Sequence, residues 1–311
     1  VTAGRSDEGR IREIGTRMLD LARKHKSGLL SAKFYSDWLM EWSMKDPNFK
    51  VQMFRYVDAF PMLRTVDDKF DHLKDYLGQP GVTVPGPIDL GIKAGGLARG
   101  LFIGTVSKQI EGMAAKFIAG TDAASALPNL RELWDDGIAF SVDLLGEACV
   151  SDEEAEAYQR KYLDLVNNLP TTVASWKPNQ RLETDYLGPV PRTNVSIKIS
   201  SLTARCDPID TEGSIRELMR RIVPILEAAK AKGVFVNFDM EQFAFKDLTL
   251  ELFMRCCEQV DFPAGLAMQA YLRSGEDDAR RICEWSKRTG RVVTVRLVKG
   301  AYWDYQVIHA E

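Results

Sequence analysis

Strands and helices alternate along the second half of the chain, and this alternation limits the fold more than any other feature of the sequence. From Ile138 onward, short runs rich in Val, Ile, Leu and Phe are separated by longer stretches with helical apolar periodicity. The predicted strands cover residues 139–145, 195–199, 234–238, 266–271 and 292–297. Repeated strand–helix units predict an α/β fold with a parallel sheet and right-handed crossovers. An open doubly wound sheet and a (β/α)8 barrel both satisfy the pattern.

Polar side chains at the ends of the predicted strands favour the barrel. They are Asp143 and Glu147, Lys198, Ser200 and Ser201, Asp239 and Glu241, Gln269 and Tyr271, and Arg296. The carboxyl ends of barrel strands converge on one face, where the active sites of such barrels lie. A structural alternative is that two ion pairs, Asp143–Lys198 and Asp239–Arg296, only close the top of the barrel. The two interpretations are compatible, because a buried ion pair stabilises little on balance and can serve to position side chains.

The last predicted strand leads into a segment typical of a binding site. The apolar run 292–295 is interrupted by Arg296, a cation that is rarely buried without a partner. The sequence Lys-Gly-Ala-Tyr-Trp at 299–303 follows, with two small residues that would let a ligand lie against the backbone. A strand, a cation, small residues and aromatic rings in this order indicate the floor of a pocket for a flat molecule, one that tolerates an anion.

The first half of the chain predicts helices only. Apolar residues recur with helical spacing up to residue 78, and Ser31, Asp46 with Pro47, and Thr65 suit helix starts. A connector rich in Pro, Gly and Val follows at 78–87, and helices are expected at 101–118 and 128–136, the latter ended by Gly137. The glycines between 91 and 100 fit no nucleotide-binding fingerprint. We therefore divide the chain into a helical arm at 1–80, a helical linker region at 81–137 and a βα region at 138–311.

Two details of the βα region concern its helices. Ser151 with Glu154 forms a capping-box pair, and Ser214 with Glu217 is a second candidate helix start. Residues 169–193 contain four prolines, so they predict a long insertion after the first of these helices.

The composition excludes several classes of protein. The 311 residues are 45% hydrophobic and 27% charged with a net charge of −3, and this balance gives no case for nucleic-acid binding. No apolar run approaches the ~20 residues of a membrane span, and the first residues do not resemble a signal peptide. Five cysteines without a zinc spacing, and only three histidines, argue against a metal site. Reduced thiols in a cytoplasmic protein are expected.

Five motifs together resemble the proline dehydrogenase family. They are FSVDLLGEA at 140–148, VSIKISSL at 195–202, FDME at 238–241, MQAY at 268–271 and RLVKGAYW at 296–303. The resemblance extends from about Phe60 to the end of the sequence. It is strongest to the form that bacterial bifunctional proteins of the proline utilization A type contain, and the arm before Phe60 resembles their helical N-terminal, dimerisation region.

The resemblance implies a distorted (β/α)8, TIM-like barrel with FAD on its C-terminal face. It also implies oxidation of L-proline to Δ1-pyrroline-5-carboxylate by hydride transfer to flavin N5, the first step of proline catabolism to glutamate. Electrons would pass to a membrane quinone. The resemblance thus implies a cytoplasmic homo-oligomer with peripheral contact at the inner membrane, and no operator binding is expected.

Matched position by position, the resemblance assigns roles to the residues of these motifs. Arg296 would lie beside flavin N5 and, with Asp239 and Lys198, would be catalytic. Lys198 would meet the proline carboxylate, with Asp143 and Tyr302 also in the substrate pocket. The other flavin contacts would be Met240, Gln269 on the pyrimidine side, Val298, Lys299, Gly300, Ala301 and Trp303. No metal is implied.

One departure from the family concerns the end of the sequence. The family places a pair of arginines over the substrate carboxylate, on a helix after the eighth strand, whereas this sequence has about five βα units before Glu311. We therefore expect a longer polypeptide with the remaining strands, the arginine pair and a glutamate-semialdehyde dehydrogenase module. Residues 1–311 alone are not expected to form a competent enzyme.

Two other functions stay open from the residues alone. A lysine on a barrel strand can form a Schiff base, so Lys198 could serve an aldolase. A helical assembly module with a degenerate barrel would have no activity, although packing alone gives no reason for five polar strand ends. A bound flavin that bleaches with proline would discriminate among the three.

Overall fold

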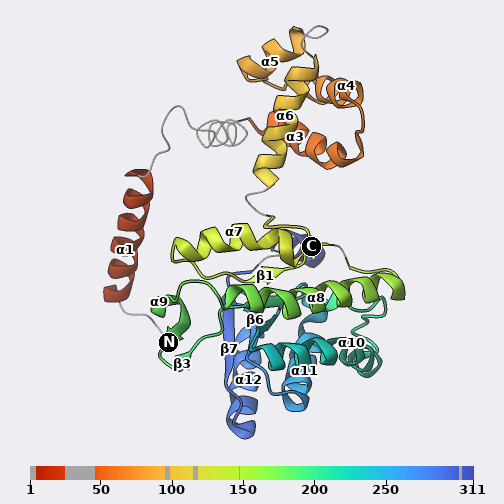
Figure 1. Cartoon of the computed structure of the whole chain (residues 1–311). Coiled ribbons are helices and arrows are strands. Elements are labelled where there is room, and N and C mark those ends of the chain that lie inside the picture. The colour runs from red at the N-terminus through yellow and green to blue at the C-terminus, as the bar shows by residue number, and fades with distance from the viewer. Residues whose placement is uncertain (1–4, 25–45, 95–98, 115–117, 147, 301–302) are drawn as a thin grey trace. The chain divides into compact units, whose positions relative to one another are not determined.

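The chain divides into two compact units, residues 1–117 and residues 118–311 (Figure 1). The structure is a computed structural model that describes residues 5–24, 46–94, 99–114, 118–146, 148–300 and 303–311. The division falls within the region predicted as a linker, so the helix α7 (Ala123–Asp135) belongs to the second unit.

In the part of the first unit that the structure describes, helices are the only regular secondary structure, as the sequence predicts. Its elements are α1 (Arg5–Lys24), α3 (Pro47–Ala59), the 3-10 turn η1 (Phe60–Met62), α4 (Val66–Leu77), α5 (Gly86–Lys93) and α6 (Arg99–Ala114). Helix α4 packs against both α3 and α6. The buried side chains of this unit form a cluster of Phe49, Tyr56, Phe70, Leu73, Leu77 and Ile103.

Two of the three predicted helix starts in this unit are confirmed. The Asp46 carboxylate accepts hydrogen bonds from the backbone N–H groups of Asn48 and Phe49, with Pro47 as the first helical residue. Thr65 forms a reciprocal capping box with Asp68. These side chains satisfy backbone donors that a helix N-terminus leaves without partners. The third predicted start, Ser31, lies outside the described residues.

The second unit is built on a five-stranded, all-parallel sheet. Its strands are β1 (Val142–Asp143), β4 (Asn194–Ile197), β5 (Phe235–Phe238), β6 (Ala264–Gln269) and β7 (Val293–Val298), and they pair in the order β1-β4-β5-β6-β7. The order in the sheet is the order in the sequence, without the reversal that a doubly wound sheet requires. The predicted α/β class, with a helical region before a parallel sheet, is confirmed.

The crossover helices of this unit form a continuous layer. They are α8 (Asp152–Val173), α10 (Thr211–Lys232), α11 (Lys246–Gln259) and α12 (Gly275–Thr289), and each packs against the next. Successive right-handed crossovers on one face leave the other face of the sheet to line the inside of a barrel wall. Side chains at alternate positions of β4, such as Val195 and Ile197, are fully buried in the core between sheet and helices.

The ends of several elements differ from the prediction. β1 has two ladder residues rather than seven, because it is an edge strand that pairs with β4 alone. β6 starts two residues early, since Ala264 and Gly265 pair with both neighbouring strands although neither is strongly apolar. The helix expected at 128–136 begins at Ala123, where Asp122 caps it, and Gly137 ends it with φ of +77° as predicted.

Two further corrections concern α8 and α10. The insertion predicted from residue 169 begins only after Val173, because α8 continues through Pro170 with Leu169 and Val173 fully buried. The insertion holds α9 (Gln180–Glu183) and a small hairpin of β2 (Thr184–Asp185) and β3 (Gly188–Pro189). Ser214 does not start a helix: Asp210 caps α10.

Three further sequence features are the capping box at Ser151, the cysteines and the apolar character of the helices. The Ser151 hydroxyl accepts from the Glu154 backbone N–H, but the Glu154 carboxylate accepts from Val150, so only half of the capping box forms as predicted. All five cysteines fall within the described ranges and are free thiols. Among the described residues, no helix is long and apolar enough to cross a membrane.

Candidate functional site

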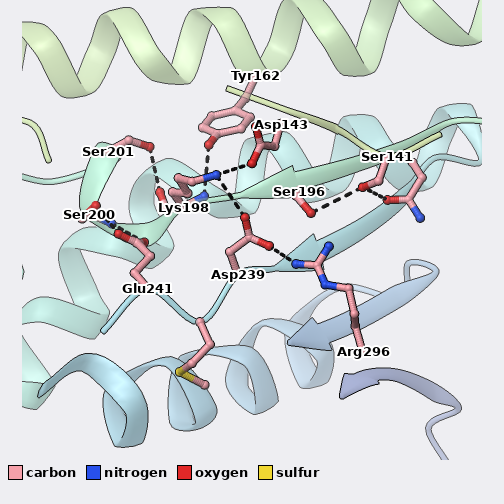
Figure 2. Close-up of polar contacts among 12 residues, drawn as sticks. Ser141, Asp143, Tyr162, Ser196, Lys198, Ser200, Ser201, Asp239, Glu241 and Arg296 are labelled. Atoms are coloured by element: carbon pink, nitrogen blue, oxygen red, sulfur yellow. Dashed lines mark hydrogen bonds and ion pairs between the residues drawn. The ribbon is translucent and has the colours of Figure 1, made fainter. Parts of the chain in front are cut away.

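Four charged side chains at the carboxyl ends of the strands form one continuous network (Figure 2). Lys198 Nζ donates to Asp239 Oδ2 at 3.1 Å and also to a carboxylate oxygen of Asp143. Arg296 donates to the second oxygen of Asp239. Acids and bases therefore alternate across β1, β4, β5 and β7. Both ion pairs that the sequence suggested are confirmed, and the Lys198–Asp239 contact joins them.

The parallel register explains why these residues meet. Asp143 pairs with Ser196, two residues before Lys198, and Phe238 pairs with Ile197. Alternate residues of a strand point to the same face, so Lys198 lies on the face of the sheet that carries Asp143 and Ser196. Lys198 and Asp239 each follow the Ile197–Phe238 pair by one position, so they lie together at the strand ends. Arg296 pairs with Ala267 on β6.

The network is partly shielded from water. The side chain of Asp239 is 13% exposed, that of Lys198 25%, and that of Arg296 45%. Burial alone would lower the pKa of Lys198, but its hydrogen bond to Asp143 and the charge of Asp239 outweigh burial and raise that pKa. Lys198 is therefore a protonated, positively charged group at neutral pH.

A turn and a helix hold Lys198 in place. The 3-10 turn η2 (Ile199–Ser201) begins directly after it, and the Ser201 hydroxyl donates to the Lys198 carbonyl at 2.7 Å. The Lys198 backbone N–H donates to the Tyr162 hydroxyl of α8 at 3.0 Å. Burial raises the pKa of Tyr162 to about 12, so this hydroxyl stays neutral. Tyr162 is a supporting residue that the sequence analysis missed, because no local pattern indicates which helix residue reaches a strand end.

A second acid lies beside the network. The Glu241 carboxylate accepts from the Ser200 backbone N–H at 3.1 Å and from the Ser200 hydroxyl (Figure 2). The sequence predicts both residues as polar strand ends and assigns neither a specific role. Their contact joins the chain after β4 to the chain after β5.

The Gln269 side chain is buried, and its amide oxygen has no hydrogen-bond partner among the described residues. It is 7% exposed, and its Nε2 donates to the Met240 carbonyl at 3.4 Å. Its Oε1 has no hydrogen-bond partner among the described residues. A buried acceptor of this kind suits an N–H donor of a flat heterocycle, and the pyrimidine ring of a flavin carries one.

The segment after β7 adds a close backbone approach. Gly300 has φ of +144°, and a Cβ there would overlap the ring of Tyr271, so only glycine fits. Trp303 packs edge-on against the same ring with centroids 6.1 Å apart. Val298 is half-buried and Lys299 is exposed. The predicted site residues Ala301 and Tyr302, like the strand-end residue Glu147, lie outside the described residues.

These observations fit the flavin that the motifs imply. An orphaned buried acceptor on β6 and a cation on the adjacent strand β7 are accompanied by a position restricted to glycine just after β7. The described residues contain no cluster of three or more His, Cys, Asp or Glu side chains that could hold a metal ion. The arrangement can bind a zwitterion or an anion next to a flat ring.

Two family models match the chain. The model described as proline dehydrogenase matches residues 126–311, and the model of the proline utilization A N-terminal domain matches residues 8–117. Both matches follow the division of the structure into two units.

Among curated proteins, the chain resembles bifunctional protein PutA of Klebsiella aerogenes and of Rhizobium meliloti. It is 28% and 30% identical to them over 203 residues, which are 64% of this chain and 15% of each relative. Proline dehydrogenase 1 of Bacillus subtilis (strain 168) is 26% identical over 189 residues, 61% of this chain and 52% of that protein. The chain thus spans about a seventh of the length of the bifunctional relatives.

The chain also resembles solved structures of proline utilization A. One is proline utilization A from Bdellovibrio bacteriovorus, inactivated by N-propargylglycine, which is 35% identical to this chain with a TM-score of 0.81. The match includes 97% of this chain and 30% of that structure. A mutant of proline utilization A from Bradyrhizobium japonicum is 20% identical with a TM-score of 0.66, over 99% of this chain and 32% of that structure. The second match supports the fold alone.

Proposed function

The chain belongs to the proline dehydrogenase family, and from this premise we propose that it takes part in the FAD-dependent oxidation of L-proline to Δ1-pyrroline-5-carboxylate. The observation that carries the proposal is the alternating network of Asp143, Lys198, Asp239 and Arg296. It contains two acids and two bases, so its formal charge is zero. A neutral network with separated charges suits a zwitterion such as proline better than a simple anion.

Lys198 is proposed to bind the substrate carboxylate. A lysine ammonium is a compact point charge with three donors, and the raised pKa keeps it protonated. Asp143 and Asp239 already hold this ammonium in position, so little conformational freedom remains to be lost on binding. The substrate carboxylate would share Lys198 with these two acids.

Arg296 and Gln269 are proposed to serve the cofactor. The flavin would supply the hydride acceptor, which the protein itself lacks. Arg296 would place a fixed positive charge where negative charge develops on the ring, and Asp239 would keep the guanidinium in that position. Gln269 would accept a hydrogen bond through its unpartnered Oε1. Met240, Val298, Lys299, Gly300, Ala301 and Trp303 remain the proposed cofactor contacts, with Tyr302 proposed for the substrate pocket.

The finer parts of the proposal rest on the family resemblance. They are the transfer of electrons to a membrane quinone, peripheral membrane contact from the cytoplasm, a homo-oligomer, and fusion to a glutamate-semialdehyde dehydrogenase. The arm at 1–80, the linker at 81–137 and the barrel portion at 138–311 likewise remain a proposed division by function.

The Schiff-base aldolase receives no support. An amine must be deprotonated to attack a carbonyl, whereas the acids around Lys198 raise its pKa. The relatives named above are PutA proteins and proline dehydrogenases, not aldolases.

An anaerobic titration tests the proposal. The purified full-length protein should be yellow, and L-proline should bleach its visible flavin absorbance in the absence of oxygen. D-Proline serves as the matched control. A protein that binds no flavin, or whose absorbance does not change with L-proline, would contradict the proposal. Trapping of Lys198 by borohydride with a keto substrate would instead favour the aldolase.

A further inference from the structure

A buried ion pair joins the first turns of α11 and α12. Lys246 Nζ donates to Asp278 Oδ1 at 2.8 Å, and the two residues are 6% and 8% exposed. Ser274 Oγ donates to the other Asp278 oxygen at 2.9 Å, and exposed Asp247 accepts from Lys246 at 2.7 Å. Helix α11 follows β5 and α12 follows β6. The pair therefore connects the chain beyond two neighbouring strand ends of the site.

Stability alone does not explain this pair. Lys246 is the first residue of α11, where the helix dipole disfavours a cation. Both charges are also removed from water, and apolar side chains of similar volume often stabilise such a position equally well. The pair is better explained by what its charges hold in place.

A small cavity connects the pair to Gln269. The cavity has a volume of about 10 Å³, and its lining includes Lys246, Asp278, Gln269 and Met240. That volume admits no more than about one water molecule, and the Lys246 and Gln269 side chains line the same space. Gly275, the first residue of α12, also approaches the Gln269 carbonyl, which a Cβ there would meet at 3.5 Å.

Donors and acceptors around this cavity are complementary. An ammonium has three N–H donors, and the two carboxylates use two of those on Lys246. Gln269 Oε1 is a buried acceptor without a partner among the described residues, while its Nε2 faces the Met240 carbonyl. A carboxamide oxygen has two lone pairs, so it can accept one hydrogen bond from Lys246 through a water in the shared cavity and another from a ligand.

We propose that Lys246 and Asp278 are a positioning pair that fixes the orientation of the Gln269 amide, with the oxygen and not the nitrogen presented to the cofactor. This inference rests on the proposed function, because it takes the partner of Gln269 to be the ring N–H of a flavin. Asp278 holds the ammonium, the ammonium attracts Oε1, and the Met240 carbonyl attracts Nε2. Neither charged residue needs to touch the flavin.

The test measures which end of the amide faces the ligand. Apoprotein of the full-length enzyme is titrated with FAD and with FAD methylated at N3, which lacks the ring donor. Wild-type protein should bind FAD about tenfold more tightly than the methylated form, the effect of one hydrogen bond and an unsatisfied buried acceptor. The double change Lys246→Met with Asp278→Leu should bring this ratio close to one, while the KM for proline stays within about twofold of wild type.

Two additional variants separate positioning from general packing. Arg221→Met removes another buried cation, which pairs with Asp152 between α8 and α10, and should lower the thermal midpoint without changing the ratio. Asp278→Asn keeps the side-chain shape, and it should lower the ratio in the same direction if the double variant does not fold.

The outcomes distinguish the two proposals. A wild-type protein that binds neither flavin contradicts the proposed function and, with it, this inference. A wild type that prefers FAD, with both pair variants showing the same preference, overturns the positioning pair alone. An equal loss of preference in Arg221→Met also overturns it, because the effect would then be general.

Discussion

At the scale of single residues, the candidate site depends on Asp239. Its two oxygens contact different cations, Lys198 and Arg296, so it neutralises the repulsion that would otherwise separate them. It is also the least exposed of the four network side chains, at 13%. The two cations nevertheless have different proposed partners, since Lys198 is assigned to the substrate and Arg296 to the cofactor. Their substitutions should therefore have different kinetic effects.

Removing each cation in turn tests this difference. Arg296→Met should lower kcat about 100-fold, the loss expected for one preorganised group that stabilises developing charge, and should weaken flavin binding. Lys198→Ala should mainly raise the KM for proline, by about 10- to 100-fold for one charged hydrogen bond. Steady-state kinetics with an artificial electron acceptor measures both parameters. Arg280→Met, at an exposed ion pair on α12, is the control. An unchanged rate in Arg296→Met would remove Arg296 from the mechanism.

At the scale of elements, the turn after β4 connects core packing to the site. Strand β4 ends at Ile197, and η2 begins two residues later, so Lys198 is the single extended residue between them. Its backbone N–H donates to Tyr162 of α8, whose ring is fully buried. A helix on the outer layer thereby determines where a strand-end cation lies.

Deletion of one hydroxyl tests this connection. Tyr162→Phe keeps the ring but leaves the Lys198 N–H without its partner, which should cost about 1–3 kcal/mol of unfolding free energy. It should also raise the KM for proline, because Lys198 loses a constraint. Tyr56→Phe is a matched control, since the buried Tyr56 hydroxyl donates to the Lys69 carbonyl in the first unit. Urea unfolding and steady-state kinetics measure both variants. Equal KM values in the two variants would contradict the connection.

Sequence patterns predicted the elements better than their ends. The strands of a parallel sheet are short apolar runs, so all five strands of this sheet were predicted, and the polar residues near their ends led to both ion pairs. Element ends depend on neighbours: Pro170 remains inside α8 because Leu169 and Val173 are buried against the sheet. The same limit applies to the site. Tyr162 and Lys246 were not predicted, because their contacts depend on how a helix is rotated against the sheet, and no local pattern records that rotation.

At the scale of the whole molecule, the described sheet has two open edges, β1 and β7. A closed barrel of this type needs eight strands, and the parallel sheet has five in the part of the chain that the structure describes. Strand β7 pairs with β6 on one side only, and Val295 and Leu297 are 42% and 69% exposed. An exposed edge strand with apolar side chains is prone to pair with another chain.

The 311-residue chain expressed alone should therefore self-associate and retain no flavin. Leu297→Lys should reduce the self-association, because a charge on an edge strand opposes pairing between copies. Sedimentation velocity at several concentrations measures the association, and absorbance of the desalted protein measures the flavin. A monomeric wild-type chain that unfolds cooperatively with bound flavin would contradict the expectation, because five strands would then suffice to hold the cofactor.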